Sequence, residues 1–319
     1  MPNPAFIYHE RFDLTWKAHV FPTQKYRLLY ERLIAEGIVG ANEFLRPQPA
    51  RRDELLLAHT ADYIDELEHI ASDPDTEDWM RFEAPLDKRV LTAVLYGTGG
   101  TIVAAQRALE CGAAMNLAGG FHHAFADHGE GFCFINDVAV AARVIQRDQP
   151  GIRITFVDCD LHQGNGTARI FRNDPLVFTF SIHQQHLYPV KEKSSLDVGL
   201  DDFDGDEEYL RGLRRGLQAV LSFEPQLVFY LAGADPFERD QPGTLRVTKA
   251  GLRQRDRMVF ETCRKANTAV AVTLAGGYSP DVCDVVDIHF ATALELCAAF
   301  DDNFQTEGAA DSSGKTGQT

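Results

Sequence analysis

The chain lacks the features that mark membrane-spanning and secreted proteins. No apolar run reaches the roughly 18 residues that a bilayer-spanning helix needs. The start, Met1-Pro2-Asn3-Pro4, carries no basic segment followed by an apolar stretch. The six cysteines are scattered and include no Cys-x-x-Cys pair, which argues against a disulfide framework. We therefore expect a soluble, cytoplasmic protein with no membrane contact.

Basic residues are also scarce. The sequence holds 31 Lys and Arg against 47 Asp and Glu, a formal net charge of -16 at pH 7. Proteins that bind nucleic acids or anionic membranes need a basic surface, so we expect neither as a direct partner. Cationic substrates remain compatible with this charge. The 45% hydrophobic and 24% charged content is that of a globular chain with a substantial core.

Short apolar segments alternate with amphipathic ones, which favours an α/β fold: an open central parallel sheet flanked by helices. The expected strands are 114–117, 152–157, 177–182, 227–231 and 269–274. The expected helices include 24–36, 61–70, 91–111, 136–146, 206–223 and 249–265. No repeat or linker divides the chain, so we expect one domain over residues 1–305 and a disordered tail over residues 306–319.

Each expected strand ends in a loop rich in polar residues or glycine, where open α/β sheets gather their ligands. The most informative loop is Asp158-Cys159-Asp160-Leu161-His162, which follows the apolar segment 152–157. If the strand continued, Asp158, Asp160 and His162 would share one face. Carboxylate and imidazole groups brought together in this way predict a site for zinc or a similar divalent ion.

A second carboxylate follows another apolar strand. Asp235 ends the run Ala232-Gly233-Ala234-Asp235, directly after segment 227–231. Asp160, His162 and Asp235 would give three protein ligands and leave an open position, as in catalytic zinc sites. The alternative is that Asp235 only caps the turn before Pro236.

Three further segments carry candidate chemistry. The tandem His122-His123 follows two glycines and could supply a base for water bound at the metal, with Asp158 fixing the tautomer of one imidazole. Tyr278, after Gly276-Gly277, could donate its hydroxyl to a developing oxyanion. Phe132 could wall a narrow apolar channel suited to an aliphatic chain. Taken singly, each segment is equally compatible with a structural role.

Taken together, four ordered motifs resemble the zinc-dependent histone deacetylase family. They are Gly119-Gly120-Phe121-His122-His123, the segment 158–166, Ala232-Gly233-Ala234-Asp235 and Ala275-Gly276-Gly277-Tyr278. The likeness runs from about Ala5 to about Cys297. The sequence His-Gln-Gly-Asn-Gly, with His59-Thr60 before Tyr63, is most similar to the class IV branch and its bacterial relatives. The resemblance implies the arginase/deacetylase fold in a single catalytic domain.

The resemblance implies two kinds of cation. Zinc would be bound by Asp160, His162 and Asp235. Potassium would lie beside the zinc loop, held partly by backbone carbonyls. The positions that match the potassium site are Asp158, Asp160, His162, Ser181 and Ile182.

The same resemblance assigns catalytic roles. His123 would act as the general base and then as the acid, while His122, paired with Asp158, would tune charge and orientation. Tyr278 would polarise the amide carbonyl together with zinc. The positions that match the acyl tunnel are Gly131, Phe132, Tyr188 and Gly276.

Asn165 stands where other branches of the family place an aspartate behind the second histidine. A neutral amide can orient His123 but cannot stabilise its imidazolium as a carboxylate would. The pH optimum is therefore left open by the sequence.

We expect a zinc-dependent amidohydrolase that removes acetyl or longer fatty acyl groups from acyl-lysine of a protein or peptide. An acetylpolyamine deacetylase, acting on another acylated amine, is the alternative. A dimanganese ureohydrolase would need further carboxylates to bridge a second metal, and the tandem histidines stand in place of such ligands. A catalytically inactive interaction module would not need the complete set of metal ligands, base and tyrosine. The sequence leaves open the acyl length, the oligomeric state and the choice between zinc and iron.

Overall fold

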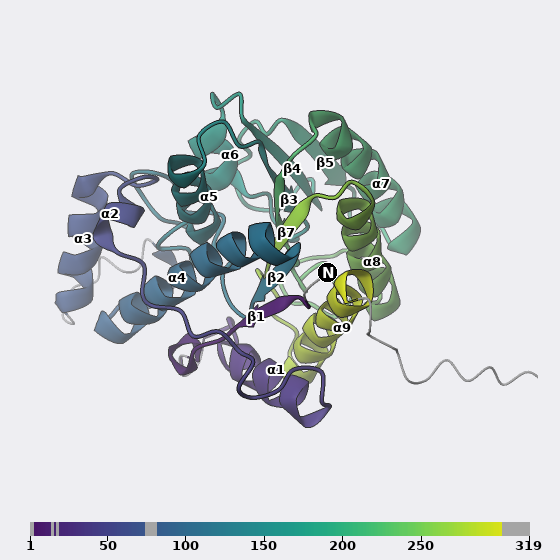
Figure 1. Cartoon of the computed structure of the whole chain (residues 1–319), viewed down its shortest axis with the longest axis horizontal. Coiled ribbons are helices and arrows are strands. Elements are labelled where there is room, and N and C mark those ends of the chain that lie inside the picture. Colours follow the sequence, from purple (N-terminus) through teal and green to yellow (C-terminus); the bar gives the residue numbers. More distant parts are fainter. Residues whose placement is uncertain (1–2, 14–15, 17–18, 74–81, 302–319) are drawn as a thin grey trace, which may run out of the picture.

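The computed structural model describes residues 3–13, 16, 19–73 and 82–301 (Figure 1). Within them the chain builds one parallel sheet in the order β1-β2-β7-β6-β3-β4-β5. The expected tail, residues 306–319, lies outside the described residues. The strands are β1 Ala5–Ile7, β2 Ala113–Asn116, β3 Ile154–Asp158, β4 Val177–Gln184, β5 Leu196–Leu200, β6 Leu227–Leu231 and β7 Ala269–Thr273.

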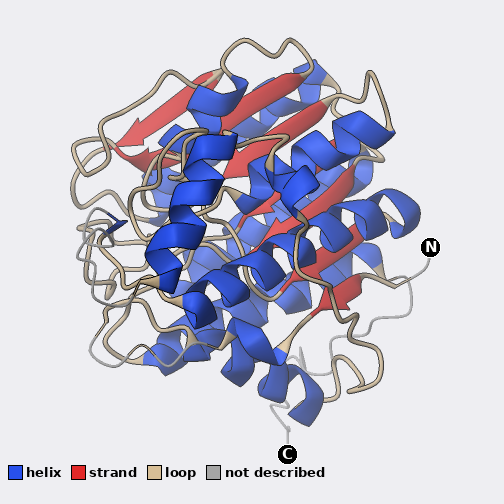
Figure 2. Cartoon of the chain, turned by 90° about the vertical axis from the view of Figure 1, so that its left-hand side faces the viewer, coloured by secondary structure: helices blue, strands red, loops and turns tan. Residues whose placement is uncertain are grey.

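Helices cover both faces of this sheet, as the two views in Figures 1 and 2 show. One apolar cluster packs α1 and α7 to α9 against one face, and a second packs α2 to α5 against the other. Strand residues alternate between the clusters: Val157 of β3 faces the first and Phe156 the second. The helices are α1 Gln24–Ala35, α2 Arg52–Leu55, α3 Ala61–Ser72, α4 Lys88–Cys111, α5 Asp137–Asp148, α6 Asn165–Phe171, α7 Asp206–Phe223, α8 Lys249–Lys265 and α9 Val282–Phe300, with a 3-10 turn at Glu10–Phe12.

The sequence prediction of an open parallel sheet flanked by helices is confirmed. All five expected strands are present within a few residues, and the expected helix bounds 206–223 and 249–265 are reproduced. The strands β1 and β5 were not among those expected. The first has three residues, and the second reads Leu-Asp-Val-Gly-Leu at the sheet edge with two exposed positions, so neither carries a long apolar run.

Strand β3 does not continue through His162, so Asp158, Asp160 and His162 do not share one strand face. The strand ends at Asp158, and its Oδ1 accepts a hydrogen bond from the backbone N–H of Asp160 at 3.1 Å. This local hydrogen bond turns the chain out of the sheet. Asp160 and His162 therefore lie in the loop that follows the strand.

The arrangement brings four neighbouring strand ends together. The strands β2, β7, β6 and β3 lie side by side and all run in the same direction. The loops that follow them carry the candidate histidine pair, Tyr278, Asp235 and the segment 158–162, in that order. The candidate site thus lies at the carboxyl ends of the central strands of the sheet.

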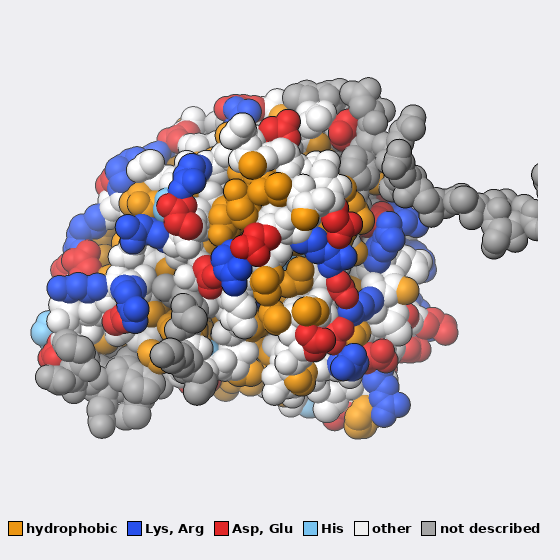
Figure 3. Space-filling model, turned by 90° about the horizontal axis from the view of Figure 1, so that it is seen from below, with side chains coloured by type: hydrophobic (Ala, Val, Ile, Leu, Met, Phe, Trp, Pro, Cys, Tyr) orange, Lys and Arg blue, Asp and Glu red, His pale blue; other side chains and the backbone are white. Residues whose placement is uncertain are grey.

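The surface carries both signs of charge despite the net charge of -16. Figure 3 shows basic and acidic side chains interspersed around a band of hydrophobic ones on the face seen from below. This face therefore offers no basic footprint of the kind that nucleic acids require. Among the described helices, none has both the length and the apolar character that crossing a bilayer demands.

Candidate active site

Asp160, His162 and Asp235 form a compact buried cluster. One potential ligand atom of each lies within 4.8 Å of the others. The Nδ1 atom of His162 is 3.2 Å from Oδ1 of Asp160 and 3.5 Å from Oδ2 of Asp235. This Oδ2 is buried and has no hydrogen-bond partner. The cluster could therefore hold a metal ion, and Asp235 does more than cap a turn.

Backbone N–H groups hold the two carboxylates in place. Oδ1 of Asp160 accepts from the N–H of His162 at 2.9 Å, and its Oδ2 accepts from the N–H of Gly276 at 2.8 Å. Oδ1 of Asp235 accepts from the N–H of Leu161 at 3.1 Å. A Cβ atom on Gly276 would lie 2.1 Å from Oδ2 of Asp235, so only glycine permits this close approach.

The charges of this cluster call for a cation. Burial and the charge of Asp160 raise the pKa of Asp235 to about 6. Burial alone would lower the pKa of His162, but its contacts with Asp160 and Asp235 raise it to about 10. The two buried carboxylates thus favour a positive charge at this position. A divalent ion would supply that positive charge directly, and the oxygen and nitrogen donors fit zinc.

A tight turn presents the histidine pair. Gly119 and Gly120 adopt positive φ angles of 81° and 87°, and the backbone N–H groups of Gly120 and Phe121 donate to Oδ1 of Asp137 at 3.0 and 2.8 Å. The preceding residue, Asn136, caps α5 through its side-chain oxygen and donates to the carbonyl of Ala124 at 3.0 Å. The N-terminus of α5 therefore fixes the backbone on both sides of His122 and His123.

The two imidazoles have different partners. Nδ1 of His122 lies 2.7 Å from Oδ2 of Asp158, and Nδ1 of His123 lies 2.8 Å from Oδ1 of Asn165. Burial opposes a charge on His122, but Asp158 and then Asp160 raise its pKa to about 9. Burial, with the charges of its histidine neighbours, holds the pKa of His123 well below the usual value. These surroundings favour a charged His122 and a neutral His123, which is able to accept a proton.

Tyr278 is held through its backbone. Oδ2 of Asp240 accepts from its N–H at 2.6 Å, and the side-chain amide of Gln241 donates to its carbonyl at 2.5 Å. The fully buried Lys25 donates to the carbonyl of Ala275, in the same turn, at 2.7 Å. Burial raises the pKa of Tyr278 well above its ordinary value, so the phenol stays neutral and can donate a hydrogen bond.

A buried arginine connects the two loops that carry the candidate metal ligands. Arg255, on α8, is fully buried and donates from Nη1 to the carbonyls of Gly233 at 2.5 Å and of Cys159 at 3.5 Å. Its charge is balanced by Asp256, 2.8 Å away. Gly233 and Cys159 each lie in one of the loops that carry a carboxylate ligand candidate.

The expected tunnel residues lie around the histidine pair. The ring of Tyr188 is 40% exposed, and its centroid is 5.4 Å from that of His123. The Phe132 ring lies 6.2 Å from that of Tyr278. Gly131 leaves room for His123, because a Cβ atom there would lie 2.6 Å from its Cδ2. Gly131, Phe132 and Tyr278 border a small hollow together with His123 and Asp160, whereas Tyr188 lies outside its lining.

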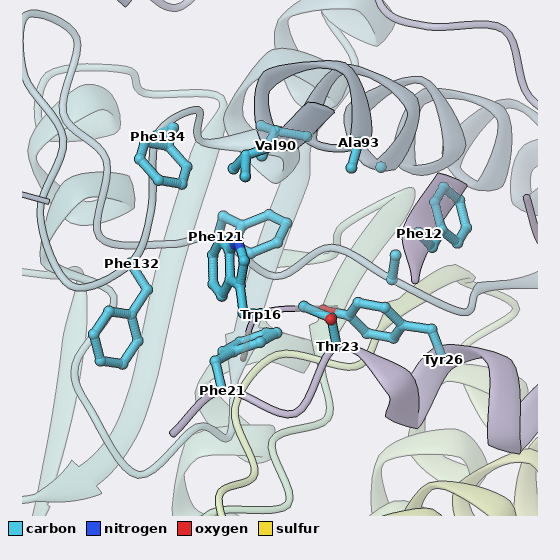
Figure 4. Close-up of a pocket in the computed structure, with 13 residues that line it drawn as sticks. Phe12, Trp16, Phe21, Thr23, Tyr26, Val90, Ala93, Phe121, Phe132 and Phe134 are labelled. Carbon is cyan, nitrogen blue, oxygen red and sulfur yellow. The ribbon is translucent and has the colours of Figure 1, made fainter. Parts of the chain in front are cut away.

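A second chamber adjoins this hollow and shares Phe21, Phe121 and Phe132 with it (Figure 4). Its walls are almost entirely apolar. Three buried polar groups in its lining, the indole N–H of Trp16 and the hydroxyls of Thr23 and Tyr26, have no hydrogen-bond partner. The lining consists of Phe12, Trp16, Phe21, Thr23, Tyr26, Val90, Ala93, Val94, Gly97, Ala118, Phe121, Phe132 and Phe134.

The positions expected to bind potassium lie in and beside the loop that carries Asp160 and His162. Ser181 and Ile182 belong to β4, and Ser181 pairs in register with Asp158 of β3. The Ser181 hydroxyl lies 2.9 Å from Nδ1 of His183. The five residues proposed for this cation thus come from two adjacent strands and the loop after β3.

Several residues that shape the site were not singled out in the sequence. Lys25, Arg255 and Gln241 hydrogen-bond loops distant in sequence, and no local pattern marks them. Asp137 could have been found, because Asn-Asp at the start of a predicted helix is a typical capping sequence.

Comparison with known proteins gives a consistent result. A model of the histone deacetylase domain matches residues 19–293. An uncharacterized protein of Picosynechococcus sp. is 42% identical over 273 residues, which are 85% of this chain and 90% of that relative. Histone deacetylase 2 of Arabidopsis thaliana is 30% identical over 291 residues, 86% of this chain and 74% of the plant protein.

The fold is also similar to solved structures. The crystal structure of the HDA15 HD domain superposes with a TM-score of 0.79 at 23% identity, covering 93% of this chain and 89% of that one. At this identity the likeness concerns the fold alone.

Proposed function

The chain belongs to the histone deacetylase family, and from that premise we propose that it is a zinc-dependent hydrolase of acyl-lysine, nearest to the class IV branch. The observation that carries the proposal is the buried Asp160, His162 and Asp235 cluster beside a neutral His123 and a neutral Tyr278. This set provides three metal ligands, a base and an oxyanion donor in one place.

Each residue has a defined task in this proposal. When bound to the three ligands, zinc supplies Lewis acidity toward the scissile carbonyl and the attacking water. His123 takes the proton of that water and returns it to the departing amine. Tyr278 donates its hydroxyl to the oxyanion. His122, kept charged by Asp158, adds positive charge beside the reaction. Potassium at the site that includes Ser181 and Ile182 would support the Asp158 loop.

The adjoining chamber supports substrates with acyl groups longer than acetyl. It is apolar and shares three phenylalanine side chains with the hollow beside His123 and Tyr278. An aliphatic chain that entered it would leave water for an apolar surface, worth about 0.8 kcal/mol per methylene group. We therefore propose fatty acyl-lysine as the better substrate.

An acetylpolyamine is the second candidate. Two acidic residues, Glu83 and Glu130, lie near enough to Tyr188 to raise its pKa together with burial. They place negative charge near Tyr188, where the ammonium groups of a bound polyamine would lie. In contrast to an acyl-lysine peptide, such a substrate would depend on these charges.

The test is a panel of lysine peptides with acetyl, octanoyl and myristoyl groups, together with acetylpolyamines, assayed on zinc-loaded protein with metal analysis. We expect hydrolysis of the peptides, with kcat/KM rising with acyl length. Absence of activity on every substrate, with metal bound, contradicts the hydrolase proposal.

A chamber-filling variant, Ala93→Phe, separates chain length from chemistry. Ala93 lines the chamber but not the hollow at the metal cluster. We expect this variant to lose at least about tenfold in kcat/KM for the myristoyl peptide, as the loss of two or more buried methylene groups would cause. Activity on the acetyl peptide should stay close to that of the wild type. An equal effect on both peptides would contradict the assignment of the chamber to the acyl chain.

A further inference from the structure

The side chain of Asn165 bridges the proposed base and a carboxylate. Its Oδ1 lies 2.8 Å from Nδ1 of His123, and its Nδ2 donates to Oε1 of Glu130 at 2.5 Å. Asn165 is 2% exposed and His123 5% exposed, whereas Glu130 is partly exposed. The three groups form a continuous chain from the metal cluster outward.

This chain of hydrogen bonds determines where the proton sits on His123. An ionised carboxylate can only accept, so Glu130 requires the NH₂ group of Asn165 on its side. The amide oxygen then faces His123, and the imidazole must donate from Nδ1. Nε2, the other ring nitrogen, is left with its lone pair free, which is the form that a general base needs.

The backbone holds Glu130 at this position. Its carbonyl accepts from the N–H of Cys133 at 2.9 Å, and the two residues form an isolated antiparallel bridge. The Glu130 carboxylate also lies near Tyr188, the half-buried tyrosine beside His123, and burial together with this charge raises the pKa of that phenol. The backbone bridge to Cys133 and the hydrogen bond from Asn165 together keep the carboxylate directed toward the site.

We propose that Glu130 is a positioning residue for the hydrolysis: through Asn165 it fixes the tautomer of His123, and it supplies the negative charge that the amide lacks. The inference rests on the proposed function and deepens it, because it assigns a residue to the working of the same base. Polarised by the carboxylate, the amide oxygen is a stronger acceptor for the Nδ1–H group when His123 takes up its proton.

A charge-exchange series tests the proposal. In Glu130→Gln the new amide can turn either way and no longer fixes Asn165, so we expect kcat to fall about tenfold or more with a smaller change in KM. In Asn165→Asp two carboxylates face each other, and kcat should also fall. In the double variant Glu130→Gln/Asn165→Asp the amide and the carboxylate exchange positions, so a hydrogen-bond donor again faces an acceptor. We expect it to be at least about tenfold more active than Asn165→Asp alone.

The control for charge is Asp127→Asn, which removes an exposed carboxylate of the same segment that hydrogen-bonds His128 instead. It should keep the wild-type kcat. Equal metal content and circular dichroism of all variants exclude unfolding. A Glu130→Gln variant within twofold of the wild-type kcat, or a double variant no better than Asn165→Asp, would overturn the proposal.

A readout without substrate separates this inference from the proposed function. Nitrogen NMR of zinc-loaded protein with isotope-labelled histidine reports the tautomer of His123, assigned with a His123→Ala variant. We expect Nδ1 to carry the proton in the wild type, and a mixture of tautomers in Glu130→Gln. If the wild type hydrolysed no substrate, the proposed function would fail, whereas a proton on Nε2 in the wild type would overturn the role of Glu130.

Discussion

Tyr278 owes its position to contacts of its backbone. Asp240 and Gln241 hold its N–H and carbonyl, and Lys25 holds the carbonyl of Ala275 three residues before it. Such an arrangement leaves the phenolic hydroxyl available to a substrate. The high pKa that burial gives this phenol keeps it a donor at all pH values at which the protein would work.

We predict that Tyr278→Phe lowers kcat by about 10²- to 10³-fold, the cost of removing one oxyanion donor. The change removes only the hydroxyl, and no hydrogen bond of the metal ligand candidates uses that group, so zinc content should equal that of the wild type. Steady-state kinetics on an acyl-lysine peptide and metal analysis are the measurements. Loss of zinc, or unchanged turnover, would contradict the role given to Tyr278.

At the scale of elements, the N-terminus of α5 organises the histidine pair. Asp137 and Asn136 hold the backbone around His122 and His123, and the N–H of Asn136 donates to Nε2 of His59 at 3.1 Å. His59 lies just before α3 and is 4% exposed. It therefore links the start of α3 to the start of α5, and it must stay neutral to accept this hydrogen bond.

This link predicts a pH dependence of stability. Burial lowers the pKa of His59 to about 4, below the value of about 6.5 for an unfolded histidine. Between these values the unfolded chain takes up a proton and the folded one does not. The contribution is present above pH 6.5 and is lost as the pH falls through 4, by up to about 3 kcal/mol.

Urea unfolding of the wild type and of His59→Gln at several pH values measures this pH dependence of the free energy of unfolding. The variant should lose less stability than the wild type between pH 6.5 and 4. The matched control is His69→Gln, an exposed histidine of α3, which should follow the wild type. Parallel curves for His59→Gln and the wild type would exclude the predicted linkage.

At the scale of the whole molecule, the candidate site joins parts of the chain that are far apart in sequence. The ligand candidates follow β3 and β6, and the hydrogen bond from Leu161 to Asp235 and the contacts of Arg255 connect their loops. Two buried carboxylates repel each other at this junction. A bound cation would remove that repulsion and stabilise the folded chain.

We predict that zinc raises the unfolding temperature and that a chelator lowers it. Zinc at 100 times its dissociation constant should add about 2.7 kcal/mol to the free energy of unfolding. Calorimetry of the protein with zinc and with chelator is the measurement, and Asp235→Ala, which lacks one ligand, should lose the dependence on zinc. The same unfolding temperature with and without zinc in the wild type would contradict metal binding at this cluster.

The parallel α/β architecture and the segments that carry the candidate catalytic residues could be predicted from the sequence. Its five apolar strand patterns and their polar ends are local signals, because a buried strand and the loop after it are encoded by adjacent residues. The same holds for the metal ligand candidates, which stand at fixed short distances behind β3 and β6.

Which side chains contact one another could not be predicted and depends on the tertiary packing. This packing placed the proposed metal ligands in one cluster, brought Lys25 and Gln241 to the turn of Tyr278, and set Glu130 behind Asn165. These partners come from different loops, and no periodicity relates them. A hydrogen bond between distant segments depends on how the whole sheet and its helices pack. The local sequence around either partner therefore does not predict it.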